Sequence, residues 1–489
     1  MPETRMLING DRVAVNPEHT IQVTSPIDGA ELGSVSDASP SEVAAAIDAA
    51  HAAFETWRTV SGAERSRMLN RLADLIDQHA GDIGRLESRD NGKLLRETTT
   101  QARFSARNYR YFAGIADKIE GKTIPLDSWD SFDYTQREPL GVVALITAWN
   151  SPMQLLANKL APALAAGCTA VVKPSELAPL STLKFGDLVI QAGFPPGVVN
   201  IITGGVDTGV ALTTDDQLGG ISFTGSVRTG QAIARAAAET LVPVTLELGG
   251  KSANIIFDDA DLDRAIAGAV AGIFAAGGQT CIAGSRLLVQ EGVADEVESR
   301  LADISESIRL GDPFDEATQM GPVASASQRE KILSVVEDAK QYARLLSGGT
   351  SPTDPQLQDG SYVSPTVFTD VSPASPLAQQ EVFGPVLAIT RFEDEAEAIE
   401  IANSTEFGLA SGLWTRDLSR AHRVARDLIA GTVWINTYRY SAAQAPFGGV
   451  KKSGIGRERG LEAIDAYLRT KNVLVDLSEE AKDPFSLRS

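Results

Sequence analysis

Two residues of this 489-residue sequence have side chains that could serve as a nucleophile and a base, and each lies in a glycine-rich stretch. Cys281 lies within Gly277–Arg286 (GGQTCIAGSR), and Glu247 lies upstream within Leu246–Lys251 (LELGGK). A thiol becomes a nucleophile when a neighbouring group activates it, and a carboxylate can activate water. A lone free cysteine, however, is commonly a small buried apolar residue. The two stretches therefore favour a nucleophile–base pair, with a structural cysteine as the alternative.

The composition indicates a globular protein of two or three domains, because a chain of this length exceeds one ordinary core. Its 64 acidic residues outnumber 44 basic residues and give a net charge of −20, which disfavours nucleic acid or an anionic membrane as a partner. No apolar run reaches the roughly 18 residues of a membrane span, and the first residues lack the apolar core of a signal peptide. We therefore expect a cytoplasmic protein that binds neither nucleic acid nor a membrane.

The cysteines and histidines give no support for a metal site. Two cysteines, Cys168 and Cys281, are too few for a disulfide framework. The four histidines are scattered, and none lies in a glycine-rich turn. We therefore expect no metal and no local Cys–His pair.

The elements that must position these residues follow an alternating order from Leu140 onward. Short strands are expected over 1–36 and helices near 62–80 and 82–119. Continuous apolar runs at 142–146 and 169–173 then alternate with helices, a pattern typical of strands buried on both faces of a parallel sheet. This region predicts a doubly wound sheet, whose strand-to-helix turns are the usual place for a ligand.

A second alternating α/β stretch begins after Val244, and the helix that starts near Asp261 leads into Cys281. Two segments do not fit either sheet. Residues 123–138 alternate apolar and polar side chains, and the apolar run 472–477 lies close to the C-terminus. Both are expected to pair with the edge of another sheet, either within the chain or across subunits.

Several strand-to-helix turns of the first sheet carry residues that could bind a dinucleotide. Gly225 ends a buried strand and Ser226 begins a helix, so a pyrophosphate could approach the helix amides. The usual G-x-G-x-x-G pattern is interrupted at Val206. Glu176 could accept hydrogen bonds from a ribose and would repel a 2′-phosphate, which favours NAD over NADP. With Lys173 it could equally form a surface ion pair.

Asn150 ends the first buried strand at the same sheet edge. Its amide could donate a hydrogen bond to a developing oxyanion, together with the backbone N–H of a nucleophile. Asparagine is also a common turn residue, so turn formation is the alternative.

Taken together, the motifs resemble those of the aldehyde dehydrogenase superfamily. They occur in the family's order and span most of the chain, and the family's cofactor fold lacks the strict glycine pattern, which agrees with Val206. The matching segments are Ala148–Asn150, Lys173–Glu176, Ala192–Asn200, Phe223–Ser226, Leu246–Ser252, Gly278–Cys281, Glu381–Val386 and Pro446–Gly449.

The resemblance implies a role for each matching residue. Cys281 is the nucleophile, Glu247 the general base, Asn150 the oxyanion donor and Lys159 a lysine behind the base. The cofactor is NAD. The implied cofactor contacts are Ile146, Thr147, Trp149, Lys173, Ser175, Glu176, Gly205, Phe223, Gly225, Ser226, Leu248, Glu381 and Phe383.

The resemblance also implies an α/β fold with two doubly wound domains and a small β oligomerisation element. The expected NAD-binding domain comprises residues 1–123 and 139–246, and the catalytic domain comprises 247–456. Residues 124–138 and 457–489 form the oligomerisation element of a homodimer or homotetramer.

The implied activity is NAD-dependent oxidation of an aldehyde to a carboxylic acid through a thiohemiacetal and a thioester. A CoA-acylating relative and a non-catalytic binding or structural protein of the same fold are the alternatives, and retention of Glu247 disfavours the first. By resemblance the aldehyde tunnel includes Asn158, Thr280, Ile282, Arg439 and Phe447. Asn158 stands where many relatives have a large aromatic, and Arg439 would place a cation in the tunnel; the alternative is that Arg439 points to solvent or to a structural partner. We therefore expect a polar aldehyde or semialdehyde.

Overall fold

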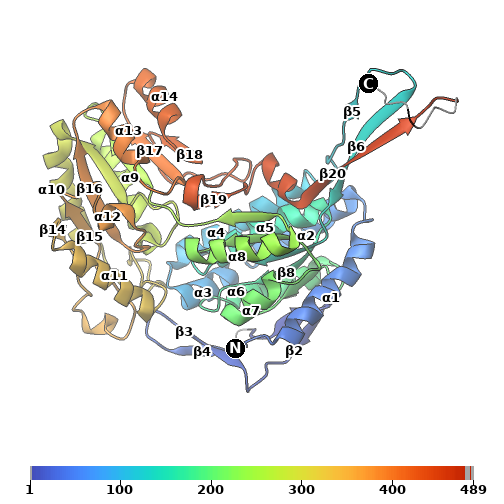
Figure 1. Ribbon diagram of the computed structural model, residues 1–489. Helices are drawn as coiled ribbons and strands as arrows, with labels where there is room; N and C mark the ends of the chain where they lie inside the picture. Colours follow the sequence, from blue (N-terminus) through green and yellow to red (C-terminus); the bar gives the residue numbers. More distant parts are fainter. Residues whose placement is uncertain (1–2, 480–484, 486–489) are drawn as a thin grey trace.

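The computed structural model describes residues 3–479 and 485. Figure 1 shows two lobes, each built on a β-sheet with helices around it, and an arm that projects from one lobe. A separate two-stranded sheet joins β3 (Thr20–Thr24) to β4 (Glu31–Ser36) near the N-terminus. No helix in the described part of the chain is long and apolar enough to cross a membrane.

The first lobe contains an eight-stranded sheet with the order β19-β11-β10-β7-β8-β9-β1-β2. The five central strands are parallel, and the three short edge strands are antiparallel to their neighbours. The central strands are β7 (Val142–Ile146), β8 (Thr169–Lys173), β9 (Val199–Ile201), β10 (Leu218–Thr224) and β11 (Val244–Glu247). The edge strands are β1 (Met6–Ile8), β2 (Asp11–Val13) and β19 (Gly454–Ile455).

Alternation along β7 explains why helices cover both faces of this sheet. Val143 and Leu145 join one apolar core, whereas Val142, Ala144 and Ile146 join the other. The first core includes α2 (Gly62–Gln78), α4 (Leu95–Ala113), α5 (Pro152–Ala166) and α6 (Leu180–Ala192); the second includes α1 (Pro40–Trp57), α7 (Val206–Thr213) and α8 (Val227–Thr240). The prediction of a doubly wound sheet is confirmed.

The second lobe contains a seven-stranded sheet with the order β14-β15-β16-β13-β12-β17-β18, in which only β14 is antiparallel. Its strands are β12 (Ala253–Ile256), β13 (Arg286–Gln290), β14 (Arg344–Ser347), β15 (Thr366–Thr369), β16 (Val386–Phe392), β17 (Ala410–Trp414) and β18 (Thr432–Ile435). Its helices are α9 (Leu262–Ile273), α10 (Glu291–Ser307), α11 (Ala326–Ala339), α12 (Pro376–Gln379), α13 (Glu395–Asn403) and α14 (Leu418–Asp427). The expected second α/β unit is therefore present.

The helix expected over 82–119 is wrong, because the chain there forms two helices. Helix α3 (Ala80–Asn91) ends at Gly92, and α4 begins at Leu95. Gly92 has φ +78°, a left-handed conformation that glycine adopts without steric cost, and its N–H donates to the Ser88 carbonyl. Helical periodicity on both sides of this turn concealed the break.

The projecting arm is a three-stranded antiparallel sheet of β5 (Thr123–Ile124), β6 (Ser131–Pro139) and β20 (Leu468–Asp476) (Figure 1). Strand β20 pairs with β6 along its whole length within the same chain. A 3₁₀ helix, Leu461–Tyr467, precedes β20. The arm exposes apolar side chains, among them Trp129, which is 99% exposed.

The fold places the predicted site residues along one edge of the first sheet. Lys173 is paired in register with Ile146, and Ile146 is paired with Phe223. On the next strand Glu247 is paired with Thr224. Because parallel strands end at the same edge, four consecutive strands deliver these side chains side by side.

Candidate active site

The turn that carries Cys281 follows helix α9 through a short 3₁₀ segment, Ala275–Gly278. Ala276 lies in the left-handed region with φ +56°, which is uncommon for a residue with a Cβ. Its N–H donates to Glu97 Oε1 at 3.0 Å, so a carboxylate on α4 holds this conformation. Cys281 itself is partly exposed. Contacts from another lobe of the chain therefore fix the cysteine turn.

Glycines in the LELGGK stretch allow two other segments to approach. A Cβ at Gly250 would lie 2.4 Å from the Cys281 carbonyl oxygen, and a Cβ at Gly249 would lie 2.3 Å from Glu381 Oε2. Both distances are shorter than any van der Waals contact. The Gly250 N–H donates to Glu381 Oε1 at 2.9 Å. The two glycines thus bring the cysteine turn and Glu381 against the end of β11.

Asn150 lies beside the same turn. Its Nδ2 donates to the Gln279 carbonyl at 2.9 Å, which leaves the second amide hydrogen without a protein acceptor among the described residues. Lys93 Nζ donates to the Asn150 carbonyl at 3.0 Å and to Ser151 Oγ at 3.1 Å. Burial lowers the pKa of Lys93 to about 8. Lys93, which the motifs did not indicate, holds the turn after β7 in place.

Glu247 lies in a buried group of charges. Its two carboxylate oxygens are buried and have no hydrogen bond to the described residues. Burial raises its pKa, the nearby Glu458 carboxylate raises it further, and Lys159 opposes the shift. Lys159 Nζ pairs with Glu458 Oε1 at 2.5 Å and donates to Ser222 Oγ at 3.1 Å. Glu247 thus has a raised pKa and two oxygens free to accept a proton, which is typical of a functional-site carboxylate.

The surroundings of Cys281 disfavour its thiolate form. Burial and the carboxylates of Glu381 and Glu247 together raise the pKa of Cys281 to about 12. The thiol is therefore protonated at neutral pH, and attack requires a group that takes its proton.

The NAD contacts implied by the motifs surround the carboxyl ends of the parallel strands. Ser226 caps α8, and its side chain accepts from the Thr229 N–H, so the first amides of that helix face the turn. Lys173 is buried, and its Nζ makes one long hydrogen bond, 3.5 Å, to the Pro174 carbonyl. Such a donor has capacity for a ribose hydroxyl. These features fit a bound dinucleotide.

The other implied contacts lie close to these. The Trp149 and Phe383 rings meet edge to face, with centroids 5.2 Å apart. Ser175 Oγ donates to Glu176 Oε2 at 3.4 Å, and the Gly205 N–H donates to Asp37 Oδ1 at 2.9 Å. The remaining positions occur at strand ends or in the turns that follow them: Ile146, Thr147, Phe223, Gly225 and Leu248.

The residues implied for substrate contact have other partners in the structure. Asn158 accepts from Asn108 Nδ2 at 2.7 Å and donates to Glu458 Oε2 at 3.1 Å. Arg439 donates to the Ala271 carbonyl at 2.9 Å, near the end of α9. Thr280 and Ile282, which flank the cysteine, are partly exposed, and so is Phe447. Their contact with a substrate stays a prediction.

Two residues of this region, Glu458 and Arg459, were missed by the sequence reasoning. They lie in Gly456–Gly460, after the Pro446–Gly449 motif. The Phe447 and Glu458 backbones exchange two hydrogen bonds of 2.7 Å, which brings the two segments together. The available signal was a run of three charged residues between two glycines.

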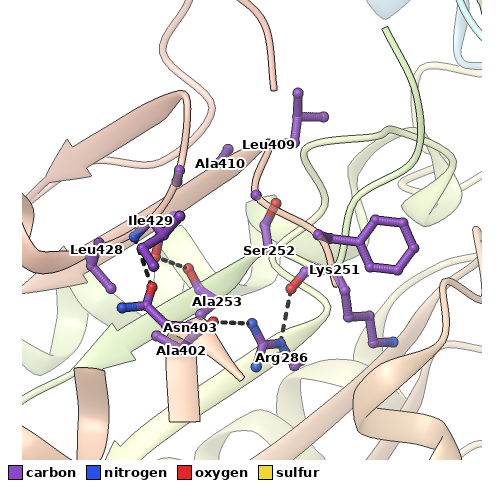
Figure 2. Close-up of a pocket in the computed structure, with 14 residues that line it drawn as sticks. Lys251, Ser252, Ala253, Arg286, Ala402, Asn403, Leu409, Ala410, Leu428 and Ile429 are labelled. Carbon is purple, nitrogen blue, oxygen red and sulfur yellow. Dashed lines mark hydrogen bonds between the residues drawn. The ribbon is translucent and has the colours of Figure 1, made fainter. Parts of the chain in front are cut away.

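A small pocket lies behind the LELGGK stretch (Figure 2). The Arg286 guanidinium donates to the carbonyls of Lys251, Ile401 and Ala402 at 2.7–2.9 Å, and it thereby joins the stretch to α13. Burial and the Arg286 charge lower the pKa of Lys251 to about 7. We interpret this pocket as structural, because the Arg286 guanidinium already donates its hydrogen bonds to backbone carbonyls and so holds the LELGGK stretch in place.

The raised thiol pKa predicts how Cys281 reacts in the NAD-free protein. Its alkylation by iodoacetamide should increase about tenfold per pH unit from about pH 6 to about pH 10, because the thiolate fraction is still growing. The measurement is the alkylation rate by mass spectrometry. Cys281→Ala is the control, since only buried Cys168 then remains. A plateau below about pH 8 would contradict the prediction.

The buried ion pair predicts a loss of stability in Glu458→Gln. The substitution leaves the Lys159 charge buried without its partner, so the free energy of unfolding should fall by about 3–5 kcal/mol. Chemical denaturation measures the change. The double variant Lys159→Met/Glu458→Gln removes both charges and should recover part of the loss. A single variant as stable as the wild type would refute this account.

Comparison with known proteins places the chain in a family. Residues 13–473 match the aldehyde dehydrogenase family. The chain is 46% identical to a betaine aldehyde dehydrogenase from Cereibacter sphaeroides over 94% of both chains. It is also 46% identical to a (Z)-2-((N-methylformamido)methylene)-5-hydroxybutyrolactone dehydrogenase from Acinetobacter baylyi, over 95% of this chain and 96% of that one.

A solved structure shows the same fold. Betaine aldehyde dehydrogenase from Staphylococcus aureus in complex with NAD+ superposes with a TM-score of 0.97 and 39% identity, over 99% of this chain and 97% of that one. The resemblance carried by the eight motifs is confirmed. The chain belongs to the aldehyde dehydrogenase family.

Proposed function

We propose that the chain oxidises a polar aldehyde to its carboxylic acid with NAD, and that Cys281 carries the acyl group. The observation that supports this most directly is the packing of three segments around one thiol. Asn150 contacts the turn two residues before Cys281, and Gly250 contacts the Cys281 carbonyl. Glu247, three residues before Gly250, has two free carboxylate oxygens.

In the first step Cys281 Sγ bonds to the aldehyde carbon, and the thiol proton leaves to a base. Glu247 has a raised pKa and is the base whose charge already affects the thiol. The carbonyl oxygen gains the negative charge. The free Nδ2 hydrogen of Asn150 and the Cys281 N–H stabilise that charge, which gives the thiohemiacetal.

Bound NAD would accept the hydride that leaves the thiohemiacetal carbon. The thioester on Cys281 then needs a hydroxide equivalent. Glu247 first passes the thiol proton to solvent. It then takes a proton from water as the new C–O bond forms, and the C–S bond breaks to release the acid and the Cys281 thiolate. A CoA thiol would replace water in an acylating enzyme and would need no such base. Glu247 therefore supports hydrolysis.

The cofactor is proposed to lie along the carboxyl ends of β8, β7 and β10. Lys173 and Glu176 would hold the adenosine ribose, and the α8 amides behind Ser226 would hold the pyrophosphate. Glu381, oriented by the Gly250 N–H, and Phe383 would hold the nicotinamide end. Glu176 would disfavour a 2′-phosphate. The S. aureus relative, whose structure contains NAD+, supports this choice.

The substrate is proposed to be polar. Asn108 and Asn158 are both buried and form a polar network with Glu458 in the wall where the family commonly has a large aromatic. The names of the two curated relatives describe polar substrates, a betaine aldehyde and a hydroxybutyrolactone. Thr280, Ile282, Arg439 and Phe447 are proposed to line the same tunnel.

The assembly is proposed to be a homodimer or homotetramer in the cytoplasm. The arm exposes apolar side chains far from either core, and such a surface typically meets another subunit. Residues 124–138 and 457–479 would form this element; residues 480–484 and 486–489 of the predicted range lie outside the described residues. Residues 1–123 and 139–246 would bind NAD, and 247–456 would provide the nucleophile.

NADH absorbance with an aldehyde panel, with and without CoA, tests the reaction. We expect turnover without CoA and a loss of at least about 10³-fold in kcat for Cys281→Ala, because no other group can hold the acyl chain. Strict dependence on CoA would favour the acylating enzyme. Absence of turnover with every aldehyde would favour a binding protein.

The polar tunnel predicts the order of substrates. A semialdehyde should have a kcat/KM at least about tenfold above that of octanal or decanal, because buried polar atoms such as Asn108 Oδ1, which has no partner among the described residues, gain no hydrogen bond from a long apolar chain. Initial rates at subsaturating aldehyde measure the ratio. A strong preference for the alkanals would end the polar-substrate proposal.

A further inference from the structure

Arg459 is a buried cation with no ion pair to any carboxylate in the described part of the chain. It is 6% exposed. Its Nη1 donates to Ser441 Oγ, while its Nε is buried and has no partner. A buried guanidinium is costly unless an anion compensates it, and its planar fork suits a carboxylate. Ser441 Oγ is thus the one hydrogen-bond acceptor that the described residues provide for the buried Arg459 guanidinium.

The guanidinium is held in a defined orientation by aromatic rings. Its Cζ lies 4.4 Å from the Phe447 ring centroid and 6.0 Å from that of Phe104. The Arg459 backbone has φ +58°, an uncommon conformation for a residue with a side chain. Such strain persists where surrounding structure fixes it, which is frequent at ligand sites. The Phe447 and Phe104 rings and the fixed backbone conformation thus orient the Arg459 guanidinium in the ligand-free protein.

The charge of Arg459 reaches the reacting groups. It lowers the pKa of both Cys281 and Glu247, in opposition to their burial. Its contact with Phe447 places it on the tunnel wall proposed above. The nearest acidic side chain in sequence, Glu458, is already bound by Lys159 and Asn158. Arg459 is therefore available to an incoming anion close to the nucleophile.

We infer that Arg459 binds a carboxylate on the substrate, so that the chain acts on aldehydes that carry a second, anionic end and rejects cationic ones. This inference rests on the proposed function and narrows its substrate class to ω-carboxy aldehydes. The same charge would repel betaine aldehyde, the compound in the names of the C. sphaeroides and S. aureus relatives. Arg459 is thus a specificity-determining residue.

The test compares chain-matched substrates in the wild type and in Arg459→Leu. Succinic and glutaric semialdehydes are measured against butanal and pentanal, with betaine aldehyde as the cationic probe. In Arg459→Leu, kcat/KM for the semialdehydes should fall about 30-fold or more, since a buried charge pair is lost. Any effect of the lost charge on Cys281 and Glu247 acts on butanal as well and cancels in the ratio of semialdehyde to butanal, and the ratio of betaine aldehyde to butanal should rise.

Arg457→Leu is the matched control, because it removes a neighbouring charge that also lowers the pKa of Glu247. Its guanidinium donates to the carbonyls of Gly449 and Gly456. It should leave the ratio of semialdehyde to alkanal unchanged. An unchanged ratio in Arg459→Leu would overturn the inference while aldehyde oxidation by the wild type stands. If the wild type oxidises no aldehyde, the proposed function itself fails.

Inhibition of the wild type keeps the inference testable if Arg459→Leu does not fold. The monoamide and the diamide of glutaric acid are compared as competitive inhibitors against the aldehyde. The monoamide should bind about 30-fold more tightly, because its carboxylate reaches Arg459 and the diamide has no carboxylate. Equal inhibition constants would overturn the inference.

Discussion

The burial of charged side chains where β11 meets β19 is the constraint on which the site depends. Glu247 is paired in register with Gly454, so the segment that follows β19 must return over the same sheet edge. That segment carries Glu458 and Arg459 into the protein. A carboxylate placed there keeps its charge only with nearby cations, and Lys159 supplies one by its ion pair with Glu458. Glu247 has no hydrogen bond among the described residues, so burial and the Glu458 carboxylate raise its pKa and give its carboxylate a high affinity for a proton.

The same burial of charge explains why the Cys281 thiol requires a base before it can attack. Carboxylates and burial around Cys281 favour the neutral form, which protects the cysteine from unwanted reactions but leaves it inactive. Activation has to come from proton transfer during the reaction. Gly249 and Gly250 allow the close approach of these groups. A side chain at Gly249 would push Glu381 away from the end of β11, and one at Gly250 would push the cysteine turn away. Close packing and buried charge thus both determine the surroundings of the Cys281 thiol.

Much of this could be read from the sequence. Family, fold class and NAD-dependent aldehyde chemistry follow from motifs in a fixed order, and the alternation of buried strands and helices places those motifs at one sheet edge. The residues that the sequence missed act through distant partners. Lys93 supports Asn150 across 57 positions, and Glu458 supports Lys159 across 299. No local pattern encodes such pairs. The helix break at Gly92 was missed because both flanking segments keep helical spacing.

The central claim is that Cys281 carries the acyl group and Glu247 releases it. The most direct measurement is the intact mass of Glu247→Gln after incubation with an aldehyde and NAD+, followed by peptide mapping. The account predicts an acyl adduct on Cys281, formed slowly and with one equivalent of NADH, because the small thiolate fraction still attacks without Glu247 whereas deacylation has lost its base. A protein without an adduct that turns over as fast as the wild type would contradict it, and so would an adduct on Cys168.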